Sequence, residues 1–315
     1  MEGEDQTVVR AAWLYYMEGL TQDRVASRLG ITRLRANRLL ADARSSGLVN
    51  ITINSRLSSC LALEEELRRA AGLRDAVVVP SPGDPALLPA LLGRAAGEYV
   101  SRHLESHKVK GIGVGWGATL REAIRFVKPG RFPHINVRSL MGGLTRGLEI
   151  NTFETASALA ARLGARCSYL AAPLYAGSAK SRDTLVAQDV FRDSFREMAA
   201  TDVALLSVGD LTERSLLIRY GLPKDVKPAS LKRAGAVGDI LGRFLDESGT
   251  PIDHPINQRV ISPALAVLSR IGTVIVASGG ENKAPIIAAV LRAKLAAVLI
   301  TDEETAARAL TLCAS

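Results

Sequence analysis

The chain has 315 residues, of which 47% are hydrophobic and only 4% aromatic, and its formal net charge is +8. This length allows a small domain joined to a large one, with enough apolar content to bury a substantial core. The longest apolar stretch, residues 284–300, is interrupted by Arg292 and Lys294, so we expect no membrane span and no membrane partner. The first residues lack the pattern of a secretion signal, and we expect a cytoplasmic protein.

The sequence offers little for a metal or a disulfide. Its three cysteines, Cys60, Cys167 and Cys313, lie far apart and form no CxxC pair, which favours reduced thiols. His103 and His107 are spaced i,i+4, but no third ligand lies near them, so a solvated helix end is the simpler interpretation. We expect neither a metal nor a cofactor.

Three helices are predicted at the N-terminus. The first spans Val8–Glu18, where apolar residues recur at helical spacing. Thr21 is a candidate N-cap for residues 22–29, and Gly30 is expected to end that helix. Thr32 is a candidate cap for a third helix that runs to about Ser46 and stops at Gly47. The strand-like residues 48–53 follow, and residues 49–53 could form a wing.

The second and third helices match a helix-turn-helix, in which two short helices cross at a tight turn and the second enters the major groove. Ala26 and Ala36 allow close approach of the two helices. If the Ala/Leu side of the third helix packs inward, the opposite side carries the DNA-binding candidates Thr32, Arg33, Leu34, Arg35, Asn37 and Arg38. Arginine can bind guanine bidentately, asparagine can bind adenine, and Thr32 is placed for a phosphate. The alternative is a solvated arginine face on an ordinary helix.

The predicted boundaries are a DNA-binding domain over residues 1–55, a linker helix over 56–72 and a sensing domain over 73–315. Residues 55–59 look like a linker, and the amphipathic segment 60–71 follows, with Leu63, Leu67 and Ala70 on one side. That apolar side is a candidate for dimer contacts.

Beyond Leu73, short Val/Ile/Leu-rich runs alternate with helical stretches, which predicts an α/β fold with a doubly wound, mainly parallel sheet. The candidate strands are Ala76–Val79, Lys110–Val114, Ile135–Leu140, Ser168–Ala171, Val203–Val208, Thr273–Ala277 and Ala297–Ile300.

Four loops are candidates for a small-molecule site, because ligands of open α/β sheets bind beyond the carboxyl ends of the strands. The first carries Gly115, Trp116, Gly117 and Thr119, which could offer backbone N–H groups, an apolar wall and a hydroxyl. The others carry Gly142 with Gly143, whose bare N–H groups could hold a phosphate; Asp239, which suits vicinal hydroxyls; and Lys283, which suits phosphate.

Each candidate has a simpler structural alternative. The glycines could serve turn geometry alone, Trp116 could be core, Lys283 could be solvated, and Asp239 could cap a helix over Ile240–Phe244. The pattern Gly113-x-Gly115-x-x-Ala118 also imitates a dinucleotide fingerprint. That motif needs an acidic residue at the end of the next strand, where this chain has Met141-Gly142-Gly143, so nicotinamide binding is disfavoured.

Residues 20–49 resemble the winged helix-turn-helix of the SorC/DeoR-type sugar-binding transcriptional regulators, and the resemblance continues through nearly the whole chain. The motifs GVGWGATL, MGGL, AVGDILGRFLD, SGGENKAPII and LITDEETA occur in that family's order. The resemblance implies an effector domain like the sugar-phosphate isomerase and deaminase group, with Asp239 and Lys283 at positions that line its site. It also implies a homodimer or homotetramer. Leu34 and Ala36 depart from the residues common in the family, so the operator preference cannot be carried over.

We therefore predict a DNA-binding transcriptional regulator that represses a carbohydrate catabolism operon. Its partners would be double-stranded operator DNA and a sugar, polyol or sugar phosphate. The alternative is a sugar-phosphate isomerase or deaminase with an appended DNA-binding domain, for which Asp239 is a lone candidate base. An RNA-binding regulator is disfavoured, because the basic helix lacks aromatic stacking residues.

Overall fold

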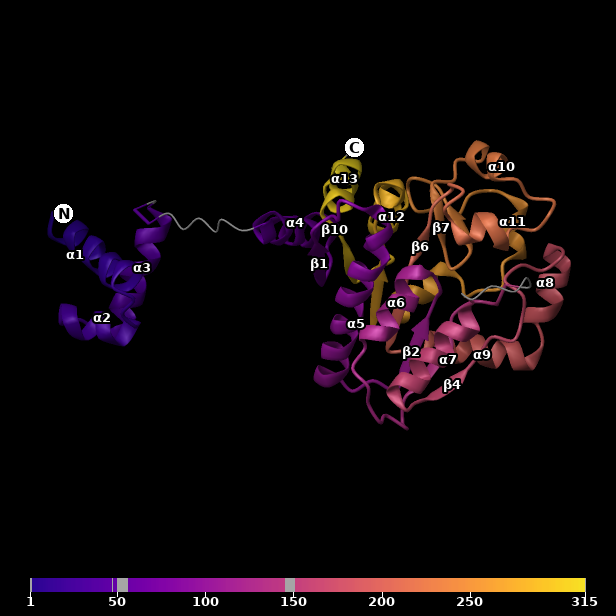
Figure 1. Ribbon diagram of the computed structural model, residues 1–315, viewed down its shortest axis with the longest axis horizontal. Helices are drawn as coiled ribbons and strands as arrows, with labels where there is room; N and C mark the ends of the chain where they lie inside the picture. Colours follow the sequence, from indigo (N-terminus) through magenta and orange to yellow (C-terminus); the bar gives the residue numbers. More distant parts are fainter. Residues whose placement is uncertain (1, 47, 50–55, 145–150, 315) are drawn as a thin grey trace. The chain divides into compact units, whose positions relative to one another are not determined.

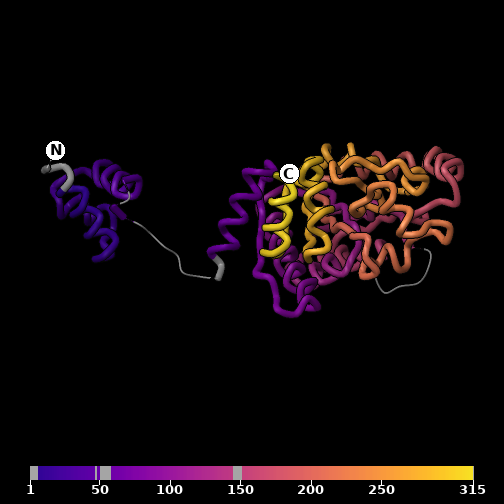
Figure 2. The backbone as a smooth tube through the Cα atoms, turned by 90° about the horizontal axis from the view of Figure 1, so that it is seen from above, coloured from indigo at the N-terminus to yellow at the C-terminus, as the bar shows by residue number. Residues whose placement is uncertain are grey.

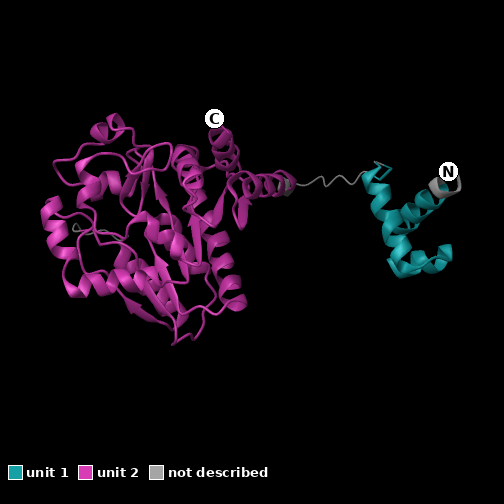
Figure 3. Ribbon diagram, turned by 180° about the vertical axis from the view of Figure 1, so that it is seen from behind, with its two compact units in different colours: residues 1–55 teal, residues 56–315 magenta. Residues whose placement is uncertain are grey.

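The computed structural model describes residues 2–46, 48–49, 56–144 and 151–314. It divides into two compact units, Met1–Ser55 and Arg56–Ser315 (Figure 3). None of the described helices is long and apolar enough to cross a membrane.

The first unit is helical. It contains α1 (Glu2–Ala12), a π-helical turn (Trp13–Met17), α2 (Gln22–Leu29) and α3 (Arg33–Ser45), shown in Figure 1. The predicted first helix began too late, since α1 already starts at Glu2, and its last turn is π-helical. A small core is closed by Leu14, Val25, Ala36 and Leu40.

Local capping sets the boundaries of α2 and α3, as the sequence predicts. Thr21 accepts a hydrogen bond from the N–H of Arg24, and Thr32 accepts one from the N–H of Arg35. Gly30 takes the left-handed conformation at φ 63° and ends α2. These three predicted caps are confirmed.

The strand predicted after α3 is not present where it can be checked. Leu48 and Val49 lie in a bend, and the Val49 N–H donates to the Ala43 carbonyl at the end of α3. The rest of the predicted strand and wing, residues 50–53, and the predicted stop at Gly47 lie outside the described residues.

The second unit contains a seven-stranded parallel sheet in the order β1-β10-β9-β5-β2-β3-β4. This arrangement confirms the predicted α/β class. The strand bounds are β1 Asp75–Val79, β2 Gly111–Val114, β3 Asn136–Ser139, β4 Arg166–Ser168, β5 Val203–Leu206, β9 Thr273–Ala277 and β10 Val298–Asp302.

Helices cover both faces of this sheet, as the tube in Figure 2 and the ribbon in Figure 1 show. Successive strand residues point to opposite faces, so Val203 and Leu205 join one core while Ala204 and Leu206 join the other. The helices are α4 Arg56–Ala71, α5 Leu88–Ser106, α6 Ala118–Phe126, α7 Thr152–Leu163, α8 Ala179–Val186, α9 Asp189–Ala199, α10 Pro228–Arg233, α11 Pro255–Arg259, α12 Ala284–Arg292 and α13 Glu303–Ala314.

A second, three-stranded antiparallel sheet was not predicted. It consists of β6 (Val208–Gly209), β7 (Gly238–Ile240) and β8 (Arg243–Leu245). The predicted strand Val203–Val208 is therefore split between two sheets, and the predicted strand Ser168–Ala171 lies earlier, at Arg166–Ser168.

The helix predicted over residues 56–72 forms as α4, Arg56–Ala71, so the residues up to 59 that look like a linker are already helical from Arg56. Its buried residues Cys60 and Leu67 join the core of the second unit, and α4 packs on β1 and α13. On the apolar side proposed for dimer contacts, Leu67 is buried within its own chain, Leu63 is half-buried and Ala70 is exposed, so this side is only partly covered.

Candidate functional site

The outer side of α3 is open in the first unit. Arg33, Leu34, Arg35, Asn37 and Arg38 are all exposed, and Leu34 is 82% exposed. The inner side of the same helix is buried, as the Ala/Leu pattern predicts. A cationic helix face with a protruding leucine suits a duplex groove, since leucine can contact a thymine methyl group while arginine reaches base edges or phosphates.

Two predicted contact residues already have partners within the unit. The Arg33 Nε lies 3.5 Å from the Asp23 carboxylate on α2, and both side chains are 66% exposed. An exposed pair of this kind contributes little and can be exchanged for a phosphate. The Thr32 hydroxyl caps α3, which leaves its own O–H free to donate.

In the second unit, a cavity of about 250 Å³ lies beyond the carboxyl ends of β2 and β5. These strands are neighbours, yet the chain continues from β2 toward β3 and β4 on one side and from β5 toward β9 and β10 on the other. This is a topological switch point, where the two connecting loops diverge and leave a crevice. The cavity therefore lies where the sheet topology predicts a ligand.

The loop after β2 supplies one edge of the cavity, with Gly115, Trp116, Gly117 and Thr119 all in its lining. Gly117 has φ 134°, a conformation that favours glycine, and it directly precedes α6. The first turn of α6 has N–H groups without helical acceptors, and Thr119 is buried beside them. The Gly115 N–H, by contrast, donates to the Leu205 carbonyl and is not available.

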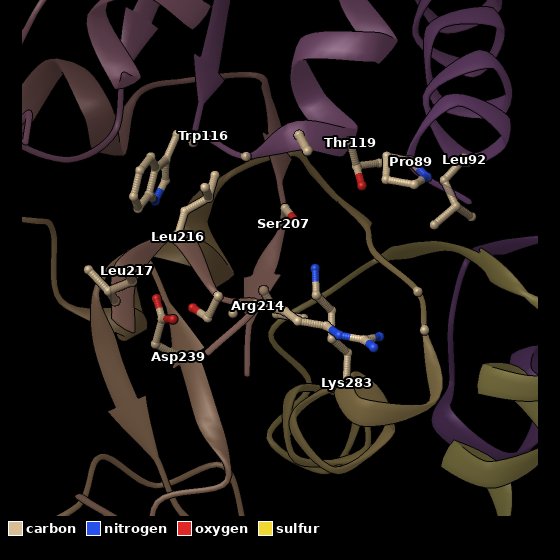
Figure 4. Close-up of a pocket in the computed structure, with 18 of the residues that line it drawn as sticks. Pro89, Leu92, Trp116, Thr119, Ser207, Arg214, Leu216, Leu217, Asp239 and Lys283 are labelled. Atoms are coloured by element: carbon tan, nitrogen blue, oxygen red, sulfur yellow. The ribbon is translucent and has the colours of Figure 1, made fainter. Parts of the chain in front are cut away.

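Apolar residues form two walls of the cavity. Figure 4 shows Trp116, Leu216 and Leu217 on one side of the view and Pro89 and Leu92 on the other, with Arg214 and Lys283 between them. Trp116 is half-buried, lines the cavity and also packs against the core.

Asp239 lies in the unpredicted hairpin. It is a strand residue of β7, so the alternative that it caps a helix over Ile240–Phe244 is wrong. Its carboxylate accepts the Gly242 N–H at 3.1 Å across the two-residue turn Leu241–Gly242. Burial raises its pKa from 3.8 to about 7, against the lowering effects of the Gly242 hydrogen bond and Lys283.

Lys283 approaches the cavity from the loop after β9. Its Nζ donates to the Ser278 hydroxyl at 3.3 Å, and burial lowers its pKa, while Asp210 and Asp239 act in the opposite direction. Among the described residues it forms no direct ion pair within 4 Å. The ammonium is therefore held in a partly dry site and is available to an anionic or hydroxyl-bearing ligand.

The predicted role of Gly142 and Gly143 does not agree with the structure. Neither lines this cavity with the other predicted residues, and Gly143 borders a separate one. The Gly142 N–H donates to the Ile261 carbonyl and the Gly143 N–H to the Ala172 carbonyl. A Cβ at Gly142 would meet the backbone of Pro173, so the glycine is required by close packing.

Four polar residues of the cavity were not predicted from the sequence, Ser207, Arg214, Ser215 and Asn282. Arg214 is exposed and forms no ion pair with another described residue. The Asn282 amide donates to the buried Asp210 carboxylate at 2.6 Å. Ser207 follows β5 directly, and the carboxyl-end rule could have identified it; nothing local identifies Arg214.

A helix-turn-helix unit joined to an α/β unit with a small-molecule cavity defines a ligand-responsive transcriptional regulator. The chain belongs to the family described as "Putative sugar-binding domain", whose model matches residues 55–311. The predicted resemblance to SorC/DeoR-type regulators is thereby confirmed, as are the fold class and the regulator function.

Two transcriptional regulators are similar to this chain over nearly their whole length. The erythritol catabolism regulatory protein EryD of Brucella abortus is 30% identical, covering 97% of this chain and 96% of that protein. The transcriptional regulator LsrR of Klebsiella pneumoniae is 33% identical, covering 98% and 94%.

Two solved structures of regulators are also similar to this chain. The full-length sorbitol operon regulator SorC of Klebsiella pneumoniae has a TM-score of 0.73 and 26% identity, covering 97% of this chain and 98% of that one. A DeoR family regulator of Listeria monocytogenes, at 23% identity and TM-score 0.72 over 80% of this chain and 99% of that one, supports the fold alone.

Proposed function

We propose that this regulator binds operator DNA through the outer side of α3 and is controlled by a sugar, polyol or sugar phosphate bound in the cavity of the second unit. Arg35, Asn37 and Arg38 would contact bases or phosphates, with Leu34 against a thymine methyl group. Their exposure and the absence of any ion pair from these side chains to other described residues support this assignment.

The cavity suits a small ligand with hydroxyl groups and an anionic end. A volume of about 250 Å³ fits a molecule of sugar size. Asp239 and Asn282 would bind hydroxyl groups, and Lys283, Arg214 and the first turn of α6 would bind a phosphate. Trp116 and the opposite Pro/Leu wall would pack on the carbon skeleton.

The effector acts by binding one conformation of the protein better than another, which shifts affinity for DNA. We propose the repressing arrangement, with derepression by the ligand, in a homodimer or homotetramer that acts in the cytoplasm. The regulator names of the similar proteins and the catabolic role in the name of EryD support a carbohydrate operon as the target.

The observation that carries the effector assignment is the convergence of Asp239, from strand β7, and Lys283, from the loop after β9, on one cavity at the switch point of the sheet. The test is thermal denaturation of the full chain with a panel of polyols, sugars and sugar phosphates. A true effector at a hundred times its Kd stabilises the second unit by about 2.7 kcal/mol. Lys283→Ala should abolish this shift, whereas the exposed control Lys232→Ala should preserve it; equal shifts in both would reject the site.

One observation favours the enzyme alternative, because a carboxyl with a pKa of about 7 suits general acid–base chemistry. No histidine, cysteine or glutamate lines the described cavity beside Asp239. We therefore propose binding without turnover. Incubation of the chain with the stabilising ligand, followed by mass and isomer analysis, decides the matter: a product that disappears in Asp239→Asn would establish an enzyme.

A further inference from the structure

An apolar stripe runs along the outer side of the first helix of the DNA-binding unit. Val9 is 47% exposed, Trp13 57% and Met17 67%, although the neighbouring Ala11 and Leu14 are buried in the core of the unit. Exposed large apolar side chains gathered on one helix face indicate a contact surface more often than scattered ones do.

The π-helical turn keeps these three side chains in line. In an α-helix with 3.6 residues per turn, a step of four residues overshoots a full turn, which displaces Trp13 from Val9 in one sense. The turn Trp13–Met17 is π-helical, so a turn holds more than four residues, and the same step falls short of a full turn. The two displacements oppose each other and bring Met17 back over Val9.

We propose that this stripe is the contact between the DNA-binding units of two copies of this chain, packed antiparallel about a two-fold axis at Trp13. The stripe is self-complementary in this arrangement, because Trp13 meets Trp13 of the second copy and Val9 meets Met17. A two-fold interface requires the same patch on both partners, and this patch supplies it.

Charge complementarity selects the antiparallel arrangement of a second copy. Arg10 and Glu18 are exposed, lie on the same side of the stripe before and after Trp13, and form no ion pair with other described residues. An antiparallel two-fold axis places Arg10 of each copy beside Glu18 of the other, twice. A parallel pair would place each of them beside the opposite edge of the stripe and would leave both charges unpaired.

The contact leaves the recognition helix free. The α1 side that faces α3 is the buried one, so the stripe lies away from α3, and Arg35 and Arg38 stay exposed. The inference deepens the proposed function, since two joined recognition helices would read two half-sites, but the contact itself can be tested without DNA.

The test is oxidative cross-linking of the full chain in a Cys167→Ser/Cys313→Ser background, where the native Cys60 is buried. Trp13→Cys should form a disulfide-linked dimer. Val9→Cys mixed with Met17→Cys should form the heterologous dimer. The exposed control Ser27→Cys on α2 should stay monomeric on a non-reducing gel.

The contact would be overturned if Trp13→Cys formed no cross-link, or if Ser27→Cys cross-linked to the same extent. The antiparallel arrangement would be overturned if Val9→Cys formed a dimer with itself in the absence of Met17→Cys. Because Trp13→Cys removes an apolar side chain, circular dichroism should first confirm an unchanged melting temperature. The Val9/Met17 pair then provides the independent readout. Loss of DNA binding with cross-linking intact would count against the proposed function alone.

Discussion

The buried carboxyl of Asp239 makes stability depend on pH in an unusual direction. Because burial raises its pKa from 3.8 to about 7, the folded chain keeps a proton that the unfolded chain releases. The contribution of this proton to stability is complete below the unfolded pKa and is lost as the pH rises through about 7. With roughly 1.4 kcal/mol for each tenfold change in proton affinity, the whole loss is roughly 4 kcal/mol.

Asp239→Asn removes the titration and keeps a side-chain oxygen that can accept the Gly242 N–H. We expect wild-type stability to fall by roughly 2–3 kcal/mol between about pH 5 and 8 relative to this variant. Urea unfolding of both proteins at the two pH values, with the exposed Asp253→Asn as the charge-removal control, measures the difference. Parallel pH profiles for wild type and Asp239→Asn would refute a neutral Asp239 in the folded protein.

Three further outcomes follow from the separate units and from close packing. Arg38→Ala should weaken binding of a duplex by roughly 1–3 kcal/mol in an anisotropy titration, with the ligand-induced rise in melting temperature intact. Lys283→Ala should do the reverse, losing the ligand-induced rise while DNA affinity in the absence of ligand stays unchanged. Gly97→Ala should lower stability by roughly 1–3 kcal/mol in thermal unfolding, since the new Cβ on α5 would lie 2.8 Å from the Phe126 carbonyl carbon on α6. An unchanged melting temperature would show that α5 and α6 can move apart at no cost in free energy.

The DNA-binding unit could be predicted from local sequence because local interactions determine it. The helix ends are set by caps at Thr21, Gly30 and Thr32, each of which acts within four residues of its own position. The local sequence is therefore sufficient to predict where α2 and α3 begin and where α2 ends. The central parallel strands β2, β5, β9 and β10 were also found, because each is a short run of buried, mainly apolar residues. The edge strand β4 was misplaced, because its residues Arg166–Ser168 are polar and largely exposed. The start of α1 was missed, since its polar first turns, with Glu2 and Glu4, have no apolar period.

The hairpin around Asp239 could not be recognised because its turn residues are atypical. Leu241 has φ 53° and Gly242 φ 76°, so both turn positions are left-handed, a geometry that usually selects Asn-Gly. Leucine at the first position imitates a helix or strand interior. Leu241, the non-glycine residue of this turn, lines the cavity. Strained backbone conformations of this kind cluster at ligand-binding sites.

The contribution of Gly142 and Gly143 was misjudged for a related reason. A glycine pair after a strand has the same appearance whether its N–H groups face a ligand or, as here, the carbonyls of Ile261 and Ala172. Those acceptors come from distant parts of the chain. The exposed Arg214 was missed for the same reason, since only the tertiary fold brings it to the cavity.

The most direct measurement is the affinity of the full chain for a duplex selected by the wild-type protein from a random pool, titrated with and without the most stabilising member of the sugar panel. We expect the affinity for the duplex to change by roughly 5- to 150-fold on ligand addition and expect no such change in Lys283→Ala. A ligand that binds tightly in the cavity yet leaves the affinity for DNA unaltered would contradict it.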